Sequence, residues 1–589
     1  MPRLREIRLA ILLFGLVLLT FLPRGLSLDR HWASDENLWM HRSRNFLVAM
    51  QDREFSKTAQ AYHPGVTTMW LGSLALWTID TTKKSDASSA PFFTPERLSR
   101  IRLPIAIATG VMIFLCGFCV YRLFGGTIAV LSIAFLAIEP FLLSESRRAH
   151  TDALTALFLF LSLLLWLCYL EANLSRRRDV ILSGISFGLA CLTKSHASVF
   201  LLFIPLLLIW YTKQLNLCVA RLLWSALLWL MGTFSTVLIV FPYMWERPQF
   251  LLLCGMVGAL LVWSWKNTSK AGPAQLTQTA LEVLLGLLLA VIGCTVAAFI
   301  PIVKSMFWAL TDAHEFPKLF LGDIRYNPGW LYFPIVVCVW SGLLTLPLIG
   351  FAMSGAWSQR NLKDNKTFRI TVVLAVFILF YLFGLNLAAK KISRYLVIFL
   401  PAVSLLTVIG AMNIAQRFSK KWIRLVVLAT VFALQAVPVL RLHPYYRTYY
   451  HPLLSGTSVV ESTTCITGAG LDLAADYLNA KPNAEKLQVR MTWISKEFGY
   501  YFVGDTLQRH HHTETNSRDF DYDIEYLRDK QITGKTLVDA PDNYQIHNFL
   551  RPSIKLPRKL EHVVTLNGID YVWIYRVLNS PLTNDISTD

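Results

Sequence analysis

Long apolar runs recur along this chain, and they limit its fold more than any other feature. A helix needs about 20 mostly apolar residues to cross a bilayer, and runs near that length recur from the N-terminus to residue 440. Only 16% of the 589 residues are charged, against about 25% in an average soluble protein. These values exclude a disordered chain, a coiled coil and an ordinary soluble enzyme. The sequence therefore predicts a polytopic membrane protein with some soluble remainder.

Thirteen membrane-spanning helices are expected from these runs, with ends uncertain by a few residues. The first lies within residues 1–25, and its basic start is typical of a cytoplasmic N-terminus. The other twelve are expected at about 101–121, 126–143, 153–172, 180–193, 197–212, 218–241, 250–265, 279–301, 330–352, 368–387, 395–413 and 422–440.

The apolar run at 66–79 is short for a span, and the positive-inside rule helps to place it. If it crossed the membrane, the basic cluster at 175–179 would fall outside, and so would Lys420 and Lys421. If it lies along the surface, these clusters fall inside. An interfacial helix is therefore favoured, and a spanning helix remains the alternative.

A net charge of +18 suggests nucleic acid at first sight. On this topology, however, most Lys and Arg lie in cytoplasmic loops, so the excess is largely a topology signal. Nucleic-acid binding would need one basic face, and none is evident. All thirteen histidines fall on the outer side or at its boundary, which places any chemistry outside the cytoplasm.

The composition changes at residue 441, after which charges, Asn and His become frequent and no run could span a membrane. Residues 470–479 have helical periodicity, and 486–494 and 570–578 have strand character. We expect residues 441–589 to form a small extracytoplasmic α/β domain. Its three histidines at 510–512 favour a solvated loop over a metal site.

The first outer loop, residues 29–100, carries the most informative polar residues. Asp35 and Glu36 follow directly after the first span, where a carboxylate facing a cleft could act as a general base. The alternative is a solvated acidic pair at a helix start, where negative charge is favoured. His63, next to a Pro and a Gly that permit a turn, could contact substrate or only hold the loop.

Basic residues stand at three other outer turns. Arg148, with His150 and Asp152, precedes a span, and could bind an anionic ligand or pair with an acidic residue. Lys194 lies between two apolar helices, where an ionisable group is by default a functional candidate, although a snorkelling lysine is the alternative. Lys391 lies at a later helix boundary.

Arg394 and Tyr395 follow Lys391 at that boundary. Three positive turns at one face of a helix bundle could converge on one phosphate.

In this order, these segments resemble the GT-C membrane glycosyltransferases, and within them the superfamily of protein O-mannosyltransferases and aminoarabinose transferases, bacterial type. The match covers most of the first 480 residues. It rests on the acidic pair Asp35–Glu36, His-Pro-Gly at 63–65, Arg-Leu-Pro at 102–104, Asp152, Lys194, and Arg394–Tyr395 with Pro401 downstream.

The chain departs from the family pattern in three places. His-Pro-Gly at 63–65 replaces a double proline, so details of that loop do not transfer. Residues 249–301 look like an inserted helix hairpin, which preserves the topology downstream. A β-trefoil module is not evident.

The resemblance implies that residues 1–440 form a transmembrane GT-C domain that transfers a sugar from a polyprenyl-phosphate donor to a hydroxyl, with inversion, at the outer face. Asp35 would be the base. Lys194 and Arg394 would stabilise the leaving phosphate, and Asp152 would orient the acceptor or fix a basic residue. The implied substrate-binding set is Glu36, His63, Arg148, His150, Asp152, Lys194, Lys391, Arg394 and Tyr395.

The acceptor could be a lipid, a glycan or a protein, and the sequence does not name the sugar. We expect no essential metal, although a divalent ion is possible because His63, His150, His314 and Glu315 are ligand types on the outer side. A lipid-linked sugar transporter or flippase is the main alternative. No internal repeat supports it, and the ionisable residues gather at one surface.

Overall fold

The computed structural model describes most of the chain. The described residues are 2–33, 35–61, 64–78, 92–246, 318–325, 327–360, 365–388, 391–454, 468–491, 495–508, 520–532 and 557–578.

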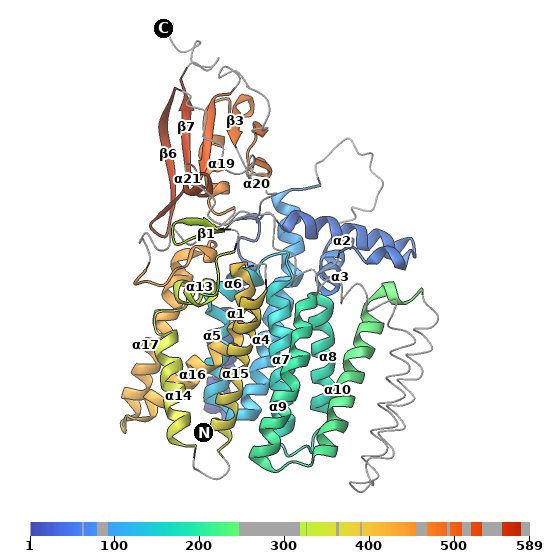
Figure 1. Ribbon diagram of the computed structural model, residues 1–589. Helices are drawn as coiled ribbons and strands as arrows, with labels where there is room; N and C mark the ends of the chain where they lie inside the picture. Colours follow the sequence, from blue (N-terminus) through green and yellow to red (C-terminus); the bar gives the residue numbers. More distant parts are fainter. Residues whose placement is uncertain are drawn as a thin grey trace.

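Long helices run side by side as a bundle, and an α/β domain stands on one end of it (Figure 1). We call this the domain end; the N-terminus lies at the opposite end. The bundle helices are α1 (Pro2–Gly25), α4 (Pro95–Phe124), α5 (Gly126–Ile138), α6 (Pro140–Ser146), α7 (Asp152–Glu171), α8 (Arg177–Thr193), α9 (Phe200–Leu215), α10 (Val219–Val240), α13 (Tyr332–Trp340), α14 (Thr345–Ser358), α15 (Lys366–Leu387), α16 (Leu400–Gln416) and α17 (Lys421–Leu442).

Within the described ranges, eight helices are long and apolar enough to cross a membrane, or up to ten if each of two bent pairs is one span. The expected spans at 250–265 and 279–301, and with them the expected hairpin at 249–301, lie outside the described residues. The other eleven expected spans are helical, including the 17-residue α8. The chain is thus a multi-pass membrane protein, and the total of thirteen spans stays a prediction.

Two expected spans are broken, which the apolar pattern did not reveal. The run at 126–143 divides into α5 and α6, bent by 65°. Glu139 at the break has extended backbone angles (φ −66°, ψ 115°) because Pro140 follows it, and a residue before proline avoids the helical region. The run at 330–352 divides into α13 and α14, bent by 104°.

Two short helices, α2 (Glu36–Gln51) and α3 (Val66–Trp77), lie at the domain end of the bundle (Figure 1). The apolar helix α3 has 12 residues, fewer than the roughly 20 that a span requires. Its length therefore supports an interfacial helix, and its place relative to a bilayer stays a prediction.

The α/β domain is built on one mixed sheet with strand order β4-β3-β5-β7-β6. Strand β3 runs parallel to β4 and β5, whereas β7 is antiparallel to β5 and β6. The helix and strands expected at 470–479, 486–494 and 570–578 are confirmed as α19, β3 and β7. The bounds are α19 (Leu471–Asn479), α20 (Ser495–Gly499), α21 (Leu527–Ile532), β3 (Gln488–Met491), β4 (Asp505–Gln508), β5 (Tyr522–Tyr526), β6 (Arg558–Leu566) and β7 (Ile569–Val577), and a separate hairpin comprises β1 (Lys318–Phe320) and β2 (Asp323–Arg325).

The α/β domain docks closely on the loop that follows α1. The rings of Trp32 and Tyr500 lie 4.1 Å apart, and the Tyr501 hydroxyl donates to the Asp29 carbonyl at 2.7 Å. Gly468 has φ +95°, and a Cβ there would lie 2.1 Å from the Trp32 carbonyl oxygen. Only glycine combines this backbone angle with so close an approach.

Candidate active site

Four ionisable residues from distant parts of the chain meet at the domain end of the bundle. Asp35 immediately precedes α2, Asp152 is the first residue of α7, and Lys194 caps the end of α8. Arg394 lies in the 3₁₀ segment η4 (Ser393–Phe399) that leads into α16. Since α7 packs against both α8 and η4, the packing of these elements brings their ends together.

Two carboxylates and two cations alternate in this cluster. Arg394 Nη1 pairs with Asp35 Oδ2, and its Nε lies 3.5 Å from Asp152 Oδ2. Lys194 Nζ donates to the other oxygen of Asp152, Oδ1, at 2.5 Å. Opposite charges therefore balance within the cluster, as burial of ionised groups requires.

His150 lies between the two carboxylates. Its Nδ1 is 2.9 Å from Asp152 Oδ2 and its Nε2 is 3.8 Å from Asp35 Oδ2. Trp39 of α2 presents an edge-to-face contact to the imidazole, with ring centroids 6.0 Å apart. His150 is thus held where it contacts both acids.

The members of the cluster differ in access to solvent. The side chains of Asp35 and Arg394 are 36% and 24% exposed, whereas those of Asp152 and Lys194 are each 3% exposed. The ring of Tyr395 covers Lys194, whose Nζ lies 4.5 Å from the ring centroid. A ligand entering the site therefore meets Asp35 and Arg394 first.

The Arg394 guanidinium holds the pKa of Asp35 well below its usual range, outweighing burial, which alone would raise it. A carboxyl with a lowered pKa in the folded state adds stability above its unfolded-state pKa, near 3.8, and loses this contribution as pH falls through the folded-state value.

A stability measurement tests this pair. We expect the difference in thermal midpoint between wild type and Arg394→Gln to stay constant from pH 7 to about pH 5, and to shrink below about pH 4. Arg360→Gln, at an exposed position outside the cluster, serves as the control. A difference that stays constant down to about pH 3 would contradict the lowered pKa, because both proteins would then bind the Asp35 proton equally.

Glu36 is adjacent to Asp35 in sequence, but the structure does not bring it to the cluster. Its side chain is fully buried and forms a two-point ion pair with Arg102 of α4. It also accepts from the backbone N–H groups of Ala33 and Ala149, at 3.0 and 2.8 Å. These contacts occupy the carboxylate and tie the first loop to the second.

Two further expected cations also lie apart from the cluster. Arg148 contacts Glu145 and His31, each at 3.2 Å. Lys391 Nζ donates to the carbonyl oxygens of Asn386 and Ala388, at 2.7 and 3.1 Å. Of the other expected site residues, Tyr395 lies against Lys194, and His63 falls outside the described residues.

Sequence reasoning missed a second charged group beside the cluster. Glu145 accepts from Arg447 at 3.1 Å, and Arg447 also donates to Ser393, the neighbour of Arg394, at 3.1 Å. Arg447 follows the last helix of the bundle, 302 residues from Glu145, so no local pattern could pair them.

One candidate metal group is present within the described ranges, formed by Glu145, His150 and Asp152. It shares only His150 with the expected set, because His63, His314 and Glu315 lie outside those ranges. Arg447 and Lys194 already donate to its two carboxylates. A divalent ion would therefore compete with resident cations.

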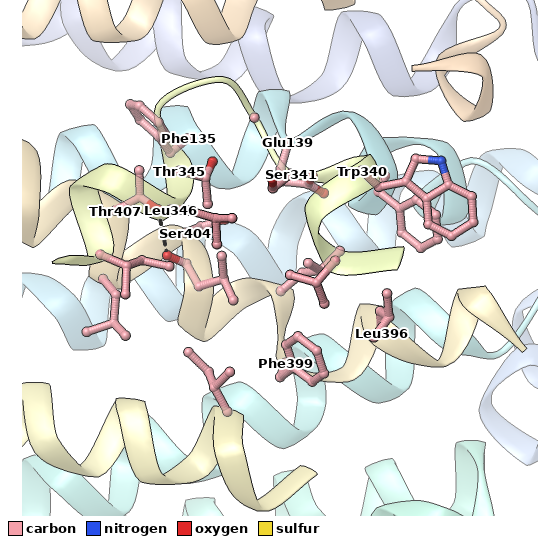
Figure 2. Close-up of a pocket in the computed structure, with 18 of the residues that line it drawn as sticks. Phe135, Glu139, Trp340, Ser341, Thr345, Leu346, Leu396, Phe399, Ser404 and Thr407 are labelled. Carbon is pink, nitrogen blue, oxygen red and sulfur yellow. Dashed lines mark hydrogen bonds between the residues drawn. The ribbon is translucent and has the colours of Figure 1, made fainter. Parts of the chain in front are cut away.

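An apolar cavity of about 360 Å³ lies inside the bundle beside η4 (Figure 2). Trp340 and Leu396 stand at one end of the view, and Thr345 and Thr407 at the other. Both helix breaks border the cavity, through Glu139 and through Ser341 with Gly342. Its mostly apolar lining suits a hydrocarbon chain better than a sugar or a phosphate.

Residues 94–245 match the family described as dolichyl-phosphate-mannose-protein mannosyltransferase. Over these residues the chain is similar to the PMT family of membrane glycosyltransferases. The matched segment contains Asp152 and Lys194, two of the four residues of the charged cluster.

Solved structures resemble the chain at low sequence identity. The oligosaccharyltransferase of Archaeoglobus fulgidus in the apo form is 12% identical over 88% of this chain and 69% of that chain, with a TM-score of 0.46. ArnT from Cupriavidus metallidurans bound to undecaprenyl phosphate is 12% identical over 96% and 97%, with a TM-score of 0.44. The Archaeoglobus enzyme in complex with Zn and sulfate is 13% identical over 87% and 68%, with a TM-score of 0.42. No curated protein sequence matches the chain significantly.

Proposed function

We propose that this protein is a glycosyltransferase, which takes its sugar from a polyprenyl-phosphate donor and transfers it, with inversion, to an acceptor hydroxyl at the outer face of the membrane. The observation that carries the proposal is the cluster itself. A partly exposed carboxylate, Asp35, stands beside one partly exposed cation, Arg394, and one buried cation, Lys194. The family description supports a polyprenyl-phosphate sugar as the donor class.

Asp35 is the base in this proposal. The acceptor oxygen attacks the anomeric carbon, its proton passes to an Asp35 oxygen, and the bond from that carbon to the phosphate oxygen breaks. The polyprenyl phosphate leaves with the electron pair from the face opposite the attack, so that one displacement inverts the configuration. A positioned base contributes about 10²–10⁴-fold to such a step.

Arg394 couples donor binding to this base. In the resting cluster Arg394 is paired with Asp35, and its charge keeps the pKa of Asp35 low, which makes Asp35 a weak base. A donor phosphate is a second anion for the same guanidinium, and Arg binds phosphate through two parallel hydrogen bonds. Phosphate binding at Arg394 would weaken its hold on Asp35 and raise the basicity of Asp35 when donor is present.

Lys194 supplies the second positive charge. It is fixed by Asp152 at 2.5 Å and shielded from solvent beneath Tyr395. A preorganised cation in a site with little water stabilises a developing phosphate charge far better than an exposed one. In this scheme Asp152 acts by fixing a basic residue, one of the two roles expected for it.

The outer location rests on topology. The α/β domain stands at one end of the bundle, and the N-terminus lies at the other (Figure 1). Asp35, at the start of α2, places the cluster at the domain end. Arg3, Arg5 and Arg8 favour a cytoplasmic N-terminus, which would place the cluster and residues 441–589 outside the cytoplasm.

We expect transfer to need no divalent metal, because Lys194 and Arg394 already supply positive charge beside the site. Treatment with EDTA should change the transfer rate less than twofold, and added Mg²⁺, Mn²⁺ or Zn²⁺ should not raise it further. A loss that one of these ions restores would instead assign a metal to Glu145, His150 and Asp152.

The defining experiment reconstitutes the protein in vesicles with a panel of labelled polyprenyl-phosphate sugars. Release of polyprenyl phosphate, with label appearing in an acceptor from cell-envelope extract, supports the transferase. Movement of intact donor across the bilayer without release would favour the flippase alternative. The configuration of the product, determined by NMR, tests inversion.

A further inference from the structure

The helix α20 brings one acidic side chain of the α/β domain toward the cluster. The helix lies on the side of its domain that faces the bundle (Figure 1). Tyr500, directly after α20, packs against Trp32 and Phe93 with tilted rings, whose centroids lie 4.1 and 5.7 Å from its own. Trp32 is three residues from Asp35, so α20 is packed against the segment that presents Asp35.

Glu497 of α20 is buried, and no cation within the described ranges contacts its carboxylate. It is 6% exposed. Within the described part of the chain, no ion pair or hydrogen bond from another side chain reaches it; its carboxylate contacts only its own backbone N–H. Burial raises the pKa of Glu497, its own backbone N–H and the neighbouring Lys496 lower it, and the negative charge of Asp35 raises it. The effect of Asp35 agrees with the packing of Tyr500 against Trp32.

An unpaired carboxylate is expensive to bury, and such groups collect at functional sites. The packing of α20 alone gives no reason for an acid here, since the helix is anchored by the buried Phe498 and by the Tyr500–Trp32 stack. In the described part of the chain this carboxylate has a hydrogen bond only from its own backbone N–H, so it is suited to accept another from a ligand.

We propose that Glu497 is an acceptor-positioning residue, contributed to the active site by the α/β domain. The cluster is then divided by charge. Arg394 and Lys194 face the donor phosphate, whereas Asp35 and Glu497 face the acceptor. This inference rests on the proposed transferase function and adds the chemistry of its acceptor.

The chemistry follows from the two acids. Asp35 takes the proton of the attacking hydroxyl. Glu497 accepts a hydrogen bond from a second hydroxyl or amine group of the same acceptor molecule. The side chain of Asn37 lies beside Tyr500, and its Oδ1 is buried without a hydrogen-bond partner, which adds a further acceptor atom on this side. The acceptor is therefore rich in hydrogen-bond donors, as a sugar with neighbouring hydroxyls or a group with an ammonium is.

The experiment compares wild type, Glu497→Gln and Glu497→Asp in the reconstituted transfer assay. Glutamine keeps the shape and removes the charge. Glu485→Gln, at an exposed position in the same domain, is the matched control. The cell-envelope extract that supports wild-type transfer is titrated as acceptor, and binding of undecaprenyl phosphate is measured by native mass spectrometry.

We expect Glu497→Gln to raise the half-saturating amount of acceptor at least tenfold. Donor KM, undecaprenyl phosphate binding and the slow release of polyprenyl phosphate without acceptor should stay within twofold of wild type. Glu497→Asp should recover part of the loss, and Glu485→Gln should behave as wild type. Fractionating the extract into neutral glycans and amine-bearing acceptors then shows whether a hydroxyl or an ammonium group forms the hydrogen bond to Glu497.

An unchanged acceptor titration in Glu497→Gln would overturn the proposal. The proposal would also be overturned if Glu497→Gln raised the donor KM as much as the half-saturating amount of acceptor, since equal effects would indicate a general structural role. The thermal midpoint of each variant identifies such a role independently. If wild type releases no polyprenyl phosphate from any donor of the panel, the proposed function fails instead, which is a separate result.

Discussion

Replacing Asp35 by Asn should lower sugar transfer by about 10²–10⁴-fold, the range that a positioned general base contributes. Asparagine has nearly the shape of aspartate but cannot accept the acceptor's proton. The effect should appear in kcat, measured as polyprenyl phosphate released per enzyme from a labelled donor.

Donor affinity should move in the opposite direction. Asp35→Asn removes the carboxylate that pairs with Arg394 in the resting cluster, so the guanidinium becomes free for phosphate. Binding of undecaprenyl phosphate should therefore stay equal to wild type or tighten. This combination of slower chemistry and undiminished binding separates a lost base from a collapsed site.

Asp52→Asn is the matched control, because Asp52 is exposed at the other end of the same helix, α2. It should transfer at the wild-type rate. If Asp35→Asn keeps more than a tenth of wild-type transfer, Asp35 is not the base, and His150, 3.8 Å away, becomes the next candidate.

Replacing Arg102 by Met should destabilise the protein by about 3–5 kcal/mol, the usual result of removing one partner of a buried ion pair. Arg102 is 2% exposed. Besides its pair with Glu36, it donates to the backbone carbonyl oxygens of Leu28, Arg30 and His31, at 2.7–2.9 Å. Methionine leaves the Glu36 carboxylate buried without its cation and frees the segment that carries Asp35.

Thermal unfolding in detergent at neutral pH measures this effect. The double variant Glu36→Gln with Arg102→Met should be more stable than Arg102→Met alone, because it removes the stranded charge. Arg100→Met is the control on the same helix. Its pair with Glu96 is exposed on both sides, and such pairs contribute little. Equal midpoints for Arg102→Met and Arg100→Met would contradict the structural role of the buried pair.

The sequence predicted secondary structure well where the signal, such as a continuous apolar run, lies within one segment of the chain. Helix α7 has a continuous apolar run, and the expected span at 153–172 agrees with Asp152–Glu171 within a residue at each end. The breaks at Glu139 and at 341–344 escaped prediction because hydropathy averages over a window. The proline that follows Glu139 was a signal for the first break.

The candidate site, too, was predicted only in part. Asp35, Lys194 and Arg394 were selected because each is ionisable at the tip of an apolar helix, and the structure brings them together. Glu36 was selected by the same criterion, yet it faces Arg102. A sequence gives the position of a side chain along the chain, whereas the direction in which a loop residue points depends on the elements packed around it.

By itself, the sequence determined that this chain crosses a membrane many times, which end of it is polar, and which helix tips carry charge. These properties follow from the free energy of transferring each residue into lipid, which depends on local composition. Only the tertiary structure decided which charges meet. Arg394 reaches Asp35 across 359 residues, and Arg447 reaches Glu145 across 302. Such pairs depend on how helices pack, and packing is set by the shapes of all the buried side chains together.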